Sequence, residues 1–162
     1  MKILKKLLVA VGLLLLVLII VSQFLPSKYH VERSVVIAAK ADDIHPWVNN
    51  LKKWPEWTVW NAERDATLVN TYTGPAEGAG AEMSWTAKEL GNGAMKLTAA
   101  DAKTGVKYEL NFENGKFLST GGVTMAPSGD STRVTFYNEG EFGMNPVRRY
   151  FGLLMDKFMG GD

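Results

Sequence analysis

The chain has 162 residues, no cysteine and a formal net charge of +1, from 18 Lys and Arg against 17 Asp and Glu. Three lysines precede a long apolar segment, so the rest of the chain carries 15 basic and 17 acidic residues and is close to −2. This balance lacks the basic stripe that nucleic-acid binding requires. The absence of cysteine excludes disulfides, thiol catalysis and thiolate metal sites.

The N-terminal segment predicts a helix that crosses a membrane once. Leu7 to Val21 contains no polar side chain, and a helix needs roughly 20 residues to span the hydrocarbon core. Residues 4–25 reach this length if the flanking lysines extend to the interface, and Pro26 then ends the helix. A cleaved signal peptide is the alternative, but residues 21–27 offer no pair of small residues for cleavage.

The charges around this segment predict its orientation. Lys2, Lys5 and Lys6 all precede it, and the positive-inside rule keeps such a flank in the cytoplasm. We therefore predict a membrane anchor over residues 1–27 and one domain over residues 28–162. The domain is expected on the periplasmic or outer side of a bacterial cytoplasmic membrane.

The first part of the domain predicts one strand and two short helical segments. Apolar and polar side chains alternate from Glu32 to Ala39, which is typical of a strand. Asp42 and Asp43 are candidate N-caps of a helix that runs to Asn50. Three tryptophans then occur within seven residues and are interrupted by Pro55, which predicts a short helix or turn packed on a core. They are Trp54, Trp57 and Trp60.

From about residue 67 the apolar side chains recur with a period of two, which predicts antiparallel strands. The expected strands cover residues 67–72, 81–86, 95–100, 106–112, 116–126 and 132–139. Gly91-Asn92-Gly93 and Asn114-Gly115 are hairpin signals between them. In the third of these strands, the alternation predicts one shared face for Met95, Leu97 and Ala99.

The end of the chain changes to a helical period. One helix face would carry Tyr150, Phe151, Leu154, Met155 and Phe158. The order is then a strand, two short helices, about six antiparallel strands and a helix. Runs of hairpin strands with helices set apart predict an α+β fold in which the sheet curves around the helices.

Three segments carry a likeness to a known family. They are Lys53-Trp54-Pro55-Glu56-Trp57-Thr58-Val59-Trp60, the glycine-rich stretch from Tyr72 to Trp85, and the closing stretch from Asn145-Pro146 to Lys157. With them, residues 30–162 resemble the START-related SRPBCC superfamily, in its bacterial polyketide cyclase/dehydrase-like branch. The resemblance implies a helix-grip fold, with a curved antiparallel sheet around a long C-terminal helix and an apolar cavity between them. Because that helix is longer in relatives, we expect the helix here to be truncated. We favour an incomplete sequence, and the alternative is that a partner or the membrane covers the exposed sheet.

The resemblance implies that a lipid or another hydrophobic small molecule binds in the cavity. Apolar residues at inward strand positions, two tryptophans and the closing helix would line it, with plain core packing as the alternative for each residue. The expected ligand-binding residues are Trp57, Trp60, Met83, Trp85, Met95, Leu97, Tyr108, Leu110, Phe112, Phe136, Phe151, Leu154 and Met155.

Two other functions remain open. A cyclase or dehydratase would need acid–base groups, for which Glu139, Glu141 and Tyr108 are the weak candidates. Alternatively, an exposed patch of the three tryptophans would dock another protein of the cell envelope. His30 and His45 have no partners at metal-ligand spacing, so we expect neither a metal nor a cofactor. Of these functions we favour ligand binding without catalysis.

Overall fold

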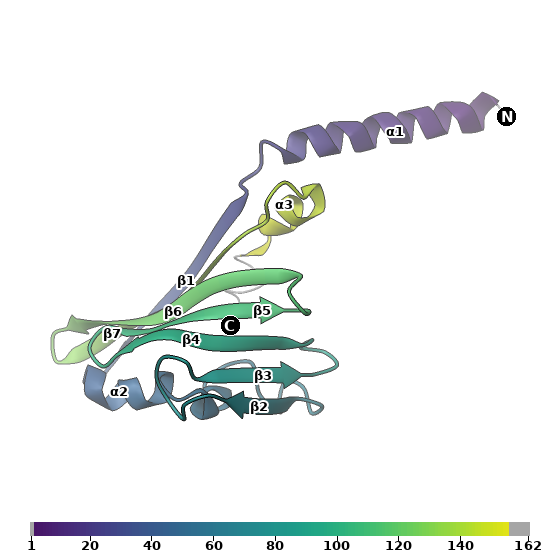
Figure 1. Ribbon diagram of the computed structural model, residues 1–162. Coiled ribbons are helices and arrows are strands. Elements are labelled where there is room, and N and C mark those ends of the chain that lie inside the picture. The colour runs from purple at the N-terminus through teal and green to yellow at the C-terminus, as the bar shows by residue number, and fades with distance from the viewer. Residues whose placement is uncertain (1, 156–162) are drawn as a thin grey trace. The chain divides into compact units, whose positions relative to one another are not determined.

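The computed structural model describes residues 2–155 (Figure 1). They form two compact units, one from residues 2–31 with 141–155 and the other from Glu32–Gly140. Seven antiparallel strands form one sheet in the order β1-β7-β6-β5-β4-β3-β2. The strands are β1 (Lys28–Ile37), β2 (Val69–Thr73), β3 (Glu82–Thr86), β4 (Gly93–Asp101), β5 (Gly105–Phe112), β6 (Phe117–Ser128) and β7 (Ser131–Glu141). The α+β helix-grip class expected from the sequence is confirmed.

The described part of the first unit contains two helices. Helix α1 (Lys2–Ser22) is long and apolar enough to cross a membrane. Helix α3 (Pro146–Gly152) begins after Asn145, whose side chain accepts a hydrogen bond from the Arg148 amide at 3.1 Å. Proline suits the first turn because its missing N–H would have no partner there. The predicted helical face extends to Phe158, which lies outside the described residues.

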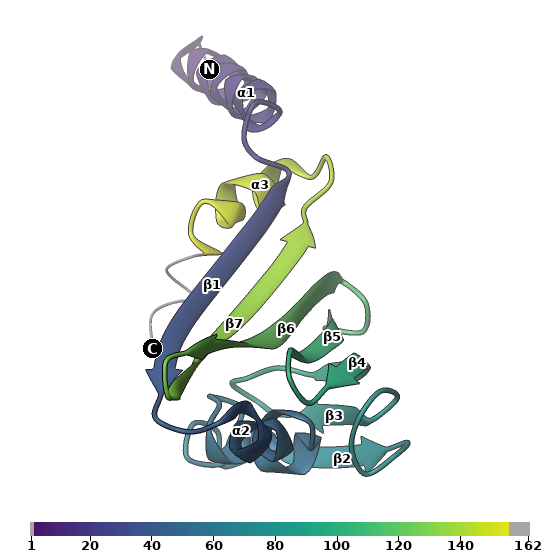
Figure 2. The same cartoon turned by 90° about the vertical axis from the view of Figure 1, so that its left-hand side faces the viewer.

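The second unit contains two short helical segments between β1 and β2. They are α2 (Ala41–Val48) and the 3₁₀ helix η1 (Leu51–Glu56), and α2 lies on one side of the curved sheet (Figure 2). The prediction that Asp42 or Asp43 caps α2 is wrong, because the helix begins earlier. Lys40 is the cap residue and makes no side-chain capping bond. The two carboxylates lie in the first turn, where the helix dipole favours negative charge.

Tight turns join the long strands as the hairpin signals predict. Between β5 and β6 the residues Glu113, Asn114 and Gly115 all have positive φ angles of 51°, 55° and 90°. Asparagine and glycine tolerate this left-handed conformation better than most residues. The β5–β6 register then runs from Phe112 opposite Phe117 to Gly105 opposite Thr124.

Strand β4 departs from the predicted alternation. Its register against β5 shifts between Leu97 and Ala99, so Met95 and Leu97 are buried but Ala99 is exposed. Ala100 packs against the core in its place. An extra residue in one strand reverses the faces that follow, which a strict period of two cannot anticipate.

A buried carboxylate joins two loops of the second unit. Asp65 is 4% exposed. Its Oδ1 accepts hydrogen bonds from the Thr67 amide and hydroxyl at 2.9 and 2.6 Å, and its Oδ2 accepts from the amides of Glu89 and Leu90 at 2.7 and 3.1 Å. The Thr67 hydroxyl, followed by the Glu89 amide, holds the pKa of this carboxyl well below its usual range. Asp65 therefore ties the entry of β2 to the loop after β3.

We expect Asp65 to stabilise the chain above acidic pH only. A carboxyl with a depressed pKa in the folded state stabilises fully above its unfolded pKa of about 3.9 and loses that contribution as pH falls towards the folded value. The difference in Tm between the natural chain and Asp65→Asn should be constant from neutral pH down to about 5 and shrink below about 4. Asp130→Asn, at an exposed position, is the control substitution. A difference independent of pH would contradict this role.

Candidate ligand-binding site

One face of the sheet gathers most of the side chains expected to contact a ligand. We call this the inner face. Alternate residues of β3, β4 and β5 point to it and are almost completely buried, with exposed fractions of 2% or less. They are Met83, Trp85, Met95, Leu97, Tyr108 and Leu110. Trp60, Phe112 and Phe136 are half-buried against the same cluster.

The three tryptophans differ in burial and do not form one exposed patch. Trp54 of η1 is completely buried, with its ring edge-on to Tyr108 at 5.8 Å between centroids. Trp57 is 39% exposed and its ring lies 4.9 Å from that of Trp54. Trp60 lies 5.9 Å from Trp85 at the other end of the cluster. These rings fix η1 and the following loop on the inner face.

A small polar group is embedded in this apolar face. The Tyr108 hydroxyl donates to the Tyr137 carbonyl at 3.1 Å. Asn138, which is 2% exposed, donates through Nδ2 to the Tyr108 hydroxyl at 3.4 Å and to the Ser119 hydroxyl at 3.2 Å. Tyr108 reaches β7 by crossing β6 at Gly121, where any Cβ would meet its hydroxyl. This hydrogen-bonding group lies beside Phe136, because the ring centroids of Tyr108 and Phe136 are 6.0 Å apart.

Towards the β1 edge, the inner face carries exposed apolar side chains. Ser34 and Thr135 hydrogen bond to each other at 2.7 Å, so their neighbours Val35 and Phe136 lie on the opposite face, which is the inner one. Val35 is 57% exposed and Ile37 is 37% exposed. Trp57 is also exposed, and Phe136 is half-buried against the core. We call these four apolar residues, Val35, Ile37, Trp57 and Phe136, the β1 margin.

The candidate acid–base groups do not come together. Glu139 and Glu141 are exposed and lie on the face opposite to Phe136 and Asn138. Tyr108 is buried on the inner face. Burial raises the pKa of Tyr137, and the charge of Glu139 adds to this shift. Within residues 2–155, no group of three or more His, Asp or Glu residues could hold a metal ion.

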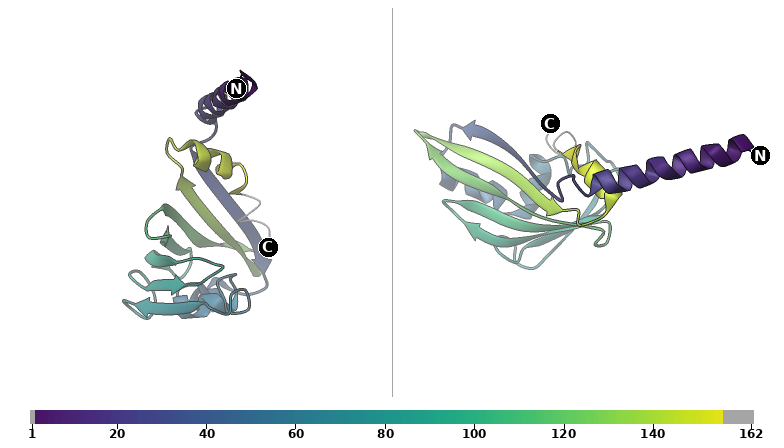
Figure 3. Two further views of the ribbon diagram at one scale, coloured as in Figure 1. Left: turned by 90° about the vertical axis from the view of Figure 1, so that its right-hand side faces the viewer. Right: turned by 90° about the horizontal axis from the view of Figure 1, so that it is seen from above.

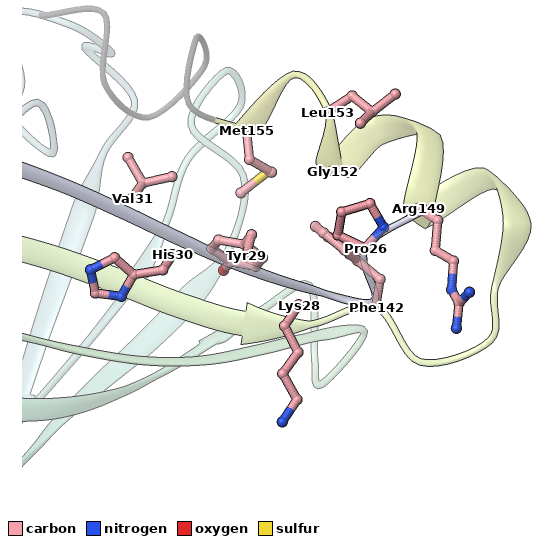
Figure 4. Close-up of a pocket in the computed structure, with 10 residues that line it drawn as sticks. All are labelled: Pro26, Lys28, Tyr29, His30, Val31, Phe142, Arg149, Gly152, Leu153 and Met155. Atoms are coloured by element: carbon pink, nitrogen blue, oxygen red, sulfur yellow. The ribbon is translucent and has the colours of Figure 1, made fainter. Parts of the chain in front are cut away.

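The first unit contains a separate pocket of about 240 Å³ beneath α3 (Figure 4). Tyr29 and Phe142 stack at 5.1 Å on its floor. Gly152 allows α3 to approach, because a Cβ there would meet the Phe142 ring. The lining residues are Pro26, Lys28, Tyr29, His30, Val31, Phe142, Arg149, Gly152, Leu153 and Met155. Of the predicted helix residues, Met155 lines this pocket, whereas Phe151 and Leu154 are exposed.

The sequence analysis did not identify several residues of the pocket beneath α3 or of the polar group on the inner face. Tyr29 and Val31 follow the same alternation as the predicted β1 but precede its expected start, so an earlier start would have found them. Asn138 continues the inner-face series of Val134 and Phe136 in β7, so the period of two could have placed it on the inner face. No local pattern identifies Phe142, which follows the end of β7.

Comparisons with known proteins agree with this architecture. Residues 28–162 match the family model described as polyketide cyclase / dehydrase and lipid transport. No curated protein matches the chain significantly. Norcoclaurine synthase from Thalictrum flavum has a similar structure, with a TM-score of 0.59, 15% identity, and 82% of this chain and 87% of that chain covered. A Thermobifida fusca protein gives a TM-score of 0.58 at 18% sequence identity, and the match covers 82% of this chain and 83% of that chain. The Aha1 dimer from Colwellia psychrerythraea gives a TM-score of 0.52 at 12% sequence identity, and the match covers 82% of this chain and 92% of that chain.

Proposed function

The chain belongs to the polyketide cyclase / dehydrase and lipid transport family, and we propose that it binds a lipid or another hydrophobic small molecule at the β1 margin of its inner face. The observation that carries the proposal is the group of apolar side chains at the β1 margin, where Val35, Ile37 and Trp57 are exposed and Phe136 packs against the buried core. Ligand sites are mostly apolar with a few placed polar groups. The Tyr108–Asn138 pair offers such a polar group beside Phe136.

Helix α1 would hold this binding domain at a membrane. Its 21 residues contain no acidic side chain and are exposed along nearly the whole length. We place its N-terminus in the cytoplasm, because the lysines precede the apolar segment. The domain would then face the outer side of the cytoplasmic membrane, and tethering would raise the effective concentration of lipid-like ligands near the β1 margin.

Binding fits the geometry better than catalysis does. Norcoclaurine synthase is an enzyme, but a likeness at 15% identity extends to the fold alone. Acid–base catalysis needs groups that contact the reacting atoms. Glu139 and Glu141 lie on the opposite face from Tyr108, so the three residues cannot act on one molecule at the inner face.

Two neighbouring valines on the same strand provide a matched test. Val35 faces the inner side and Val36 faces the opposite side, and they are 57% and 47% exposed. The full chain is placed in liposomes that contain a trace of a fatty acid carrying a photoactivatable diazirine, irradiated and digested, and the adducts are mapped by mass spectrometry. Val35→Asn should lower adduct yield on β7 and η1 about tenfold, which corresponds to about 1.4 kcal/mol. Val36→Asn should leave it unchanged.

The adducts on α1 act as an internal reference. They report contact with the bilayer and should be the same in both variants. Equal loss of β7 and η1 adducts in Val35→Asn and Val36→Asn would contradict a site on the inner face. An absence of adducts on β7 and η1 in the natural chain, with α1 labelled normally, would contradict binding of fatty-acid-like ligands.

A further inference from the structure

Helix α3 carries an apolar stripe that faces solvent. Val147 is 76% exposed, Phe151 46% and Leu154 47%, and their spacing of four and three residues puts them on one side of the helix and its last turn. Met144, three residues before Val147, is 78% exposed. Such a stripe is more apolar than a water-exposed helix usually presents.

Hydrogen bonds fix α3 at the end of α1 that leads into β1. The Arg149 guanidinium donates through Nη1 to the carbonyls of Ser22 and Gln23 at 3.2 and 2.8 Å, and through Nε to the Gly143 carbonyl at 2.7 Å. The Tyr150 hydroxyl donates to the Leu18 carbonyl at 2.8 Å. Figure 3 shows α3 beside this end of α1.

These contacts suit the boundary between lipid and water. The last carbonyls of a helix carry a partial negative charge and lack intrahelical partners, so a cation there is favourable. Leu18 lies one turn inside Ser22, a rise of about 6 Å. Tyrosine is favoured at this depth, where its ring is in the apolar region and its hydroxyl reaches polar groups. Arg149 of α3 therefore binds the end of α1, and Tyr150 of α3 binds one turn further into the apolar part of α1.

We infer that α3 is a membrane-interface helix whose stripe of Met144, Val147, Phe151 and Leu154 lies in the boundary between lipid headgroups and acyl chains. The inference rests on the proposed anchoring by α1. The bilayer would cover this stripe, because Arg149 and Tyr150 attach α3 to a helix that would end at the membrane surface. A helix that is apolar on one side and charged on the other lies in the plane of this boundary. The domain would then contact the membrane at two elements rather than at one.

The absence of cysteine makes a direct test simple. Single cysteines are introduced in the full chain as Val147→Cys or Leu154→Cys and labelled with the polarity-sensitive dye NBD. The labelled proteins are reconstituted in liposomes of phosphatidylethanolamine and phosphatidylglycerol, with and without lipids that carry a nitroxide quencher. We expect emission at shorter wavelength and loss of most of the intensity with the nitroxide lipid. Leu118→Cys, an exposed apolar position on β6, is the matched control and should keep its emission.

A label on Val9→Cys in α1 separates this inference from the anchoring. Quenching at position 9 but not at 147 and 154 would overturn the inference and leave the anchor intact. Dyes at 147 and 154 that are shielded from water but not quenched by lipid would also overturn it, in favour of a second copy covering the stripe. A lack of quenching at all three positions would overturn the anchor together with the interface helix, while fatty-acid binding at the β1 margin is measured independently.

Discussion

Replacing Trp54 by alanine should lower the free energy of unfolding by about 3–5 kcal/mol, the range found when a large buried aromatic side chain is removed. Trp54 is completely buried, and its ring contacts those of Tyr108 and Phe136 at 5.8 and 6.4 Å between centroids. Its indole N–H also donates to the Val48 carbonyl at 3.0 Å. The substitution therefore removes the side chain that connects α2 and η1 to the sheet. Urea unfolding of the full chain in detergent, followed by circular dichroism, measures the loss.

Trp57→Ala is the control for this experiment. Trp57 is three residues away and is 39% exposed, so much of its surface is already in water. Its indole N–H donates to the Trp47 carbonyl at 3.1 Å. We expect a loss of about 1 kcal/mol, the usual value for one hydrogen bond and partial burial. Equal losses for the two variants would contradict the different burial of the two tryptophans.

Gly121→Ala should be among the most damaging single-methyl substitutions in the chain. A Cβ at this position of β6 would meet both the Tyr108 hydroxyl and the backbone carbonyl of Tyr137. The tyrosine ring could move aside, but a strand backbone cannot. We expect a loss of at least about 3 kcal/mol, the upper end of the range for overpacking, measured by the same unfolding experiment.

Two further variants show which contact is responsible. Gly129→Ala has a positive φ of 63° but open space around its Cβ, so it should cost only about 1 kcal/mol. The double variant Tyr108→Phe/Gly121→Ala removes the hydroxyl but leaves the ring carbon Cζ and the Tyr137 carbonyl, so it should recover only part of the loss. Full recovery would show that the backbone contact is unimportant. A Gly121→Ala chain as stable as Gly129→Ala would contradict the crossing of Tyr108 over β6.

Regular alternation made most of the fold predictable. The six later strands were expected within a few residues of their observed bounds, because one side of each strand packs on a core. The prediction failed where geometry departs from that period, at the bulge after Leu97 and at the start of α2. Neither an extra residue in a strand nor a helix start without a side-chain cap leaves a local signal.

The sequence was less informative about the site. It predicted the inner-face residues, but could not separate buried Met83 from exposed Val35, because both follow an alternation of period two. Exposure depends on which element packs above each strand. Arg149 and Tyr150 bind carbonyls of α1 that are more than 120 positions away in the chain. Bonds to backbone carbonyls place no requirement on the residue type of the acceptor, so no pairing of side chains could indicate them.

The strand order leaves β1 and β2 as the outer strands of the sheet. An outer strand offers a row of free backbone groups to any other chain, and natural sheets discourage such pairing with charges. The middle of β1 has this protection from Glu32 and Arg33, but its last three residues, Val35, Val36 and Ile37, are apolar and exposed. Within β1, the tendency to pair with another sheet therefore resides in this short segment. Because that segment includes part of the β1 margin, a bound ligand would also protect the chain from self-association.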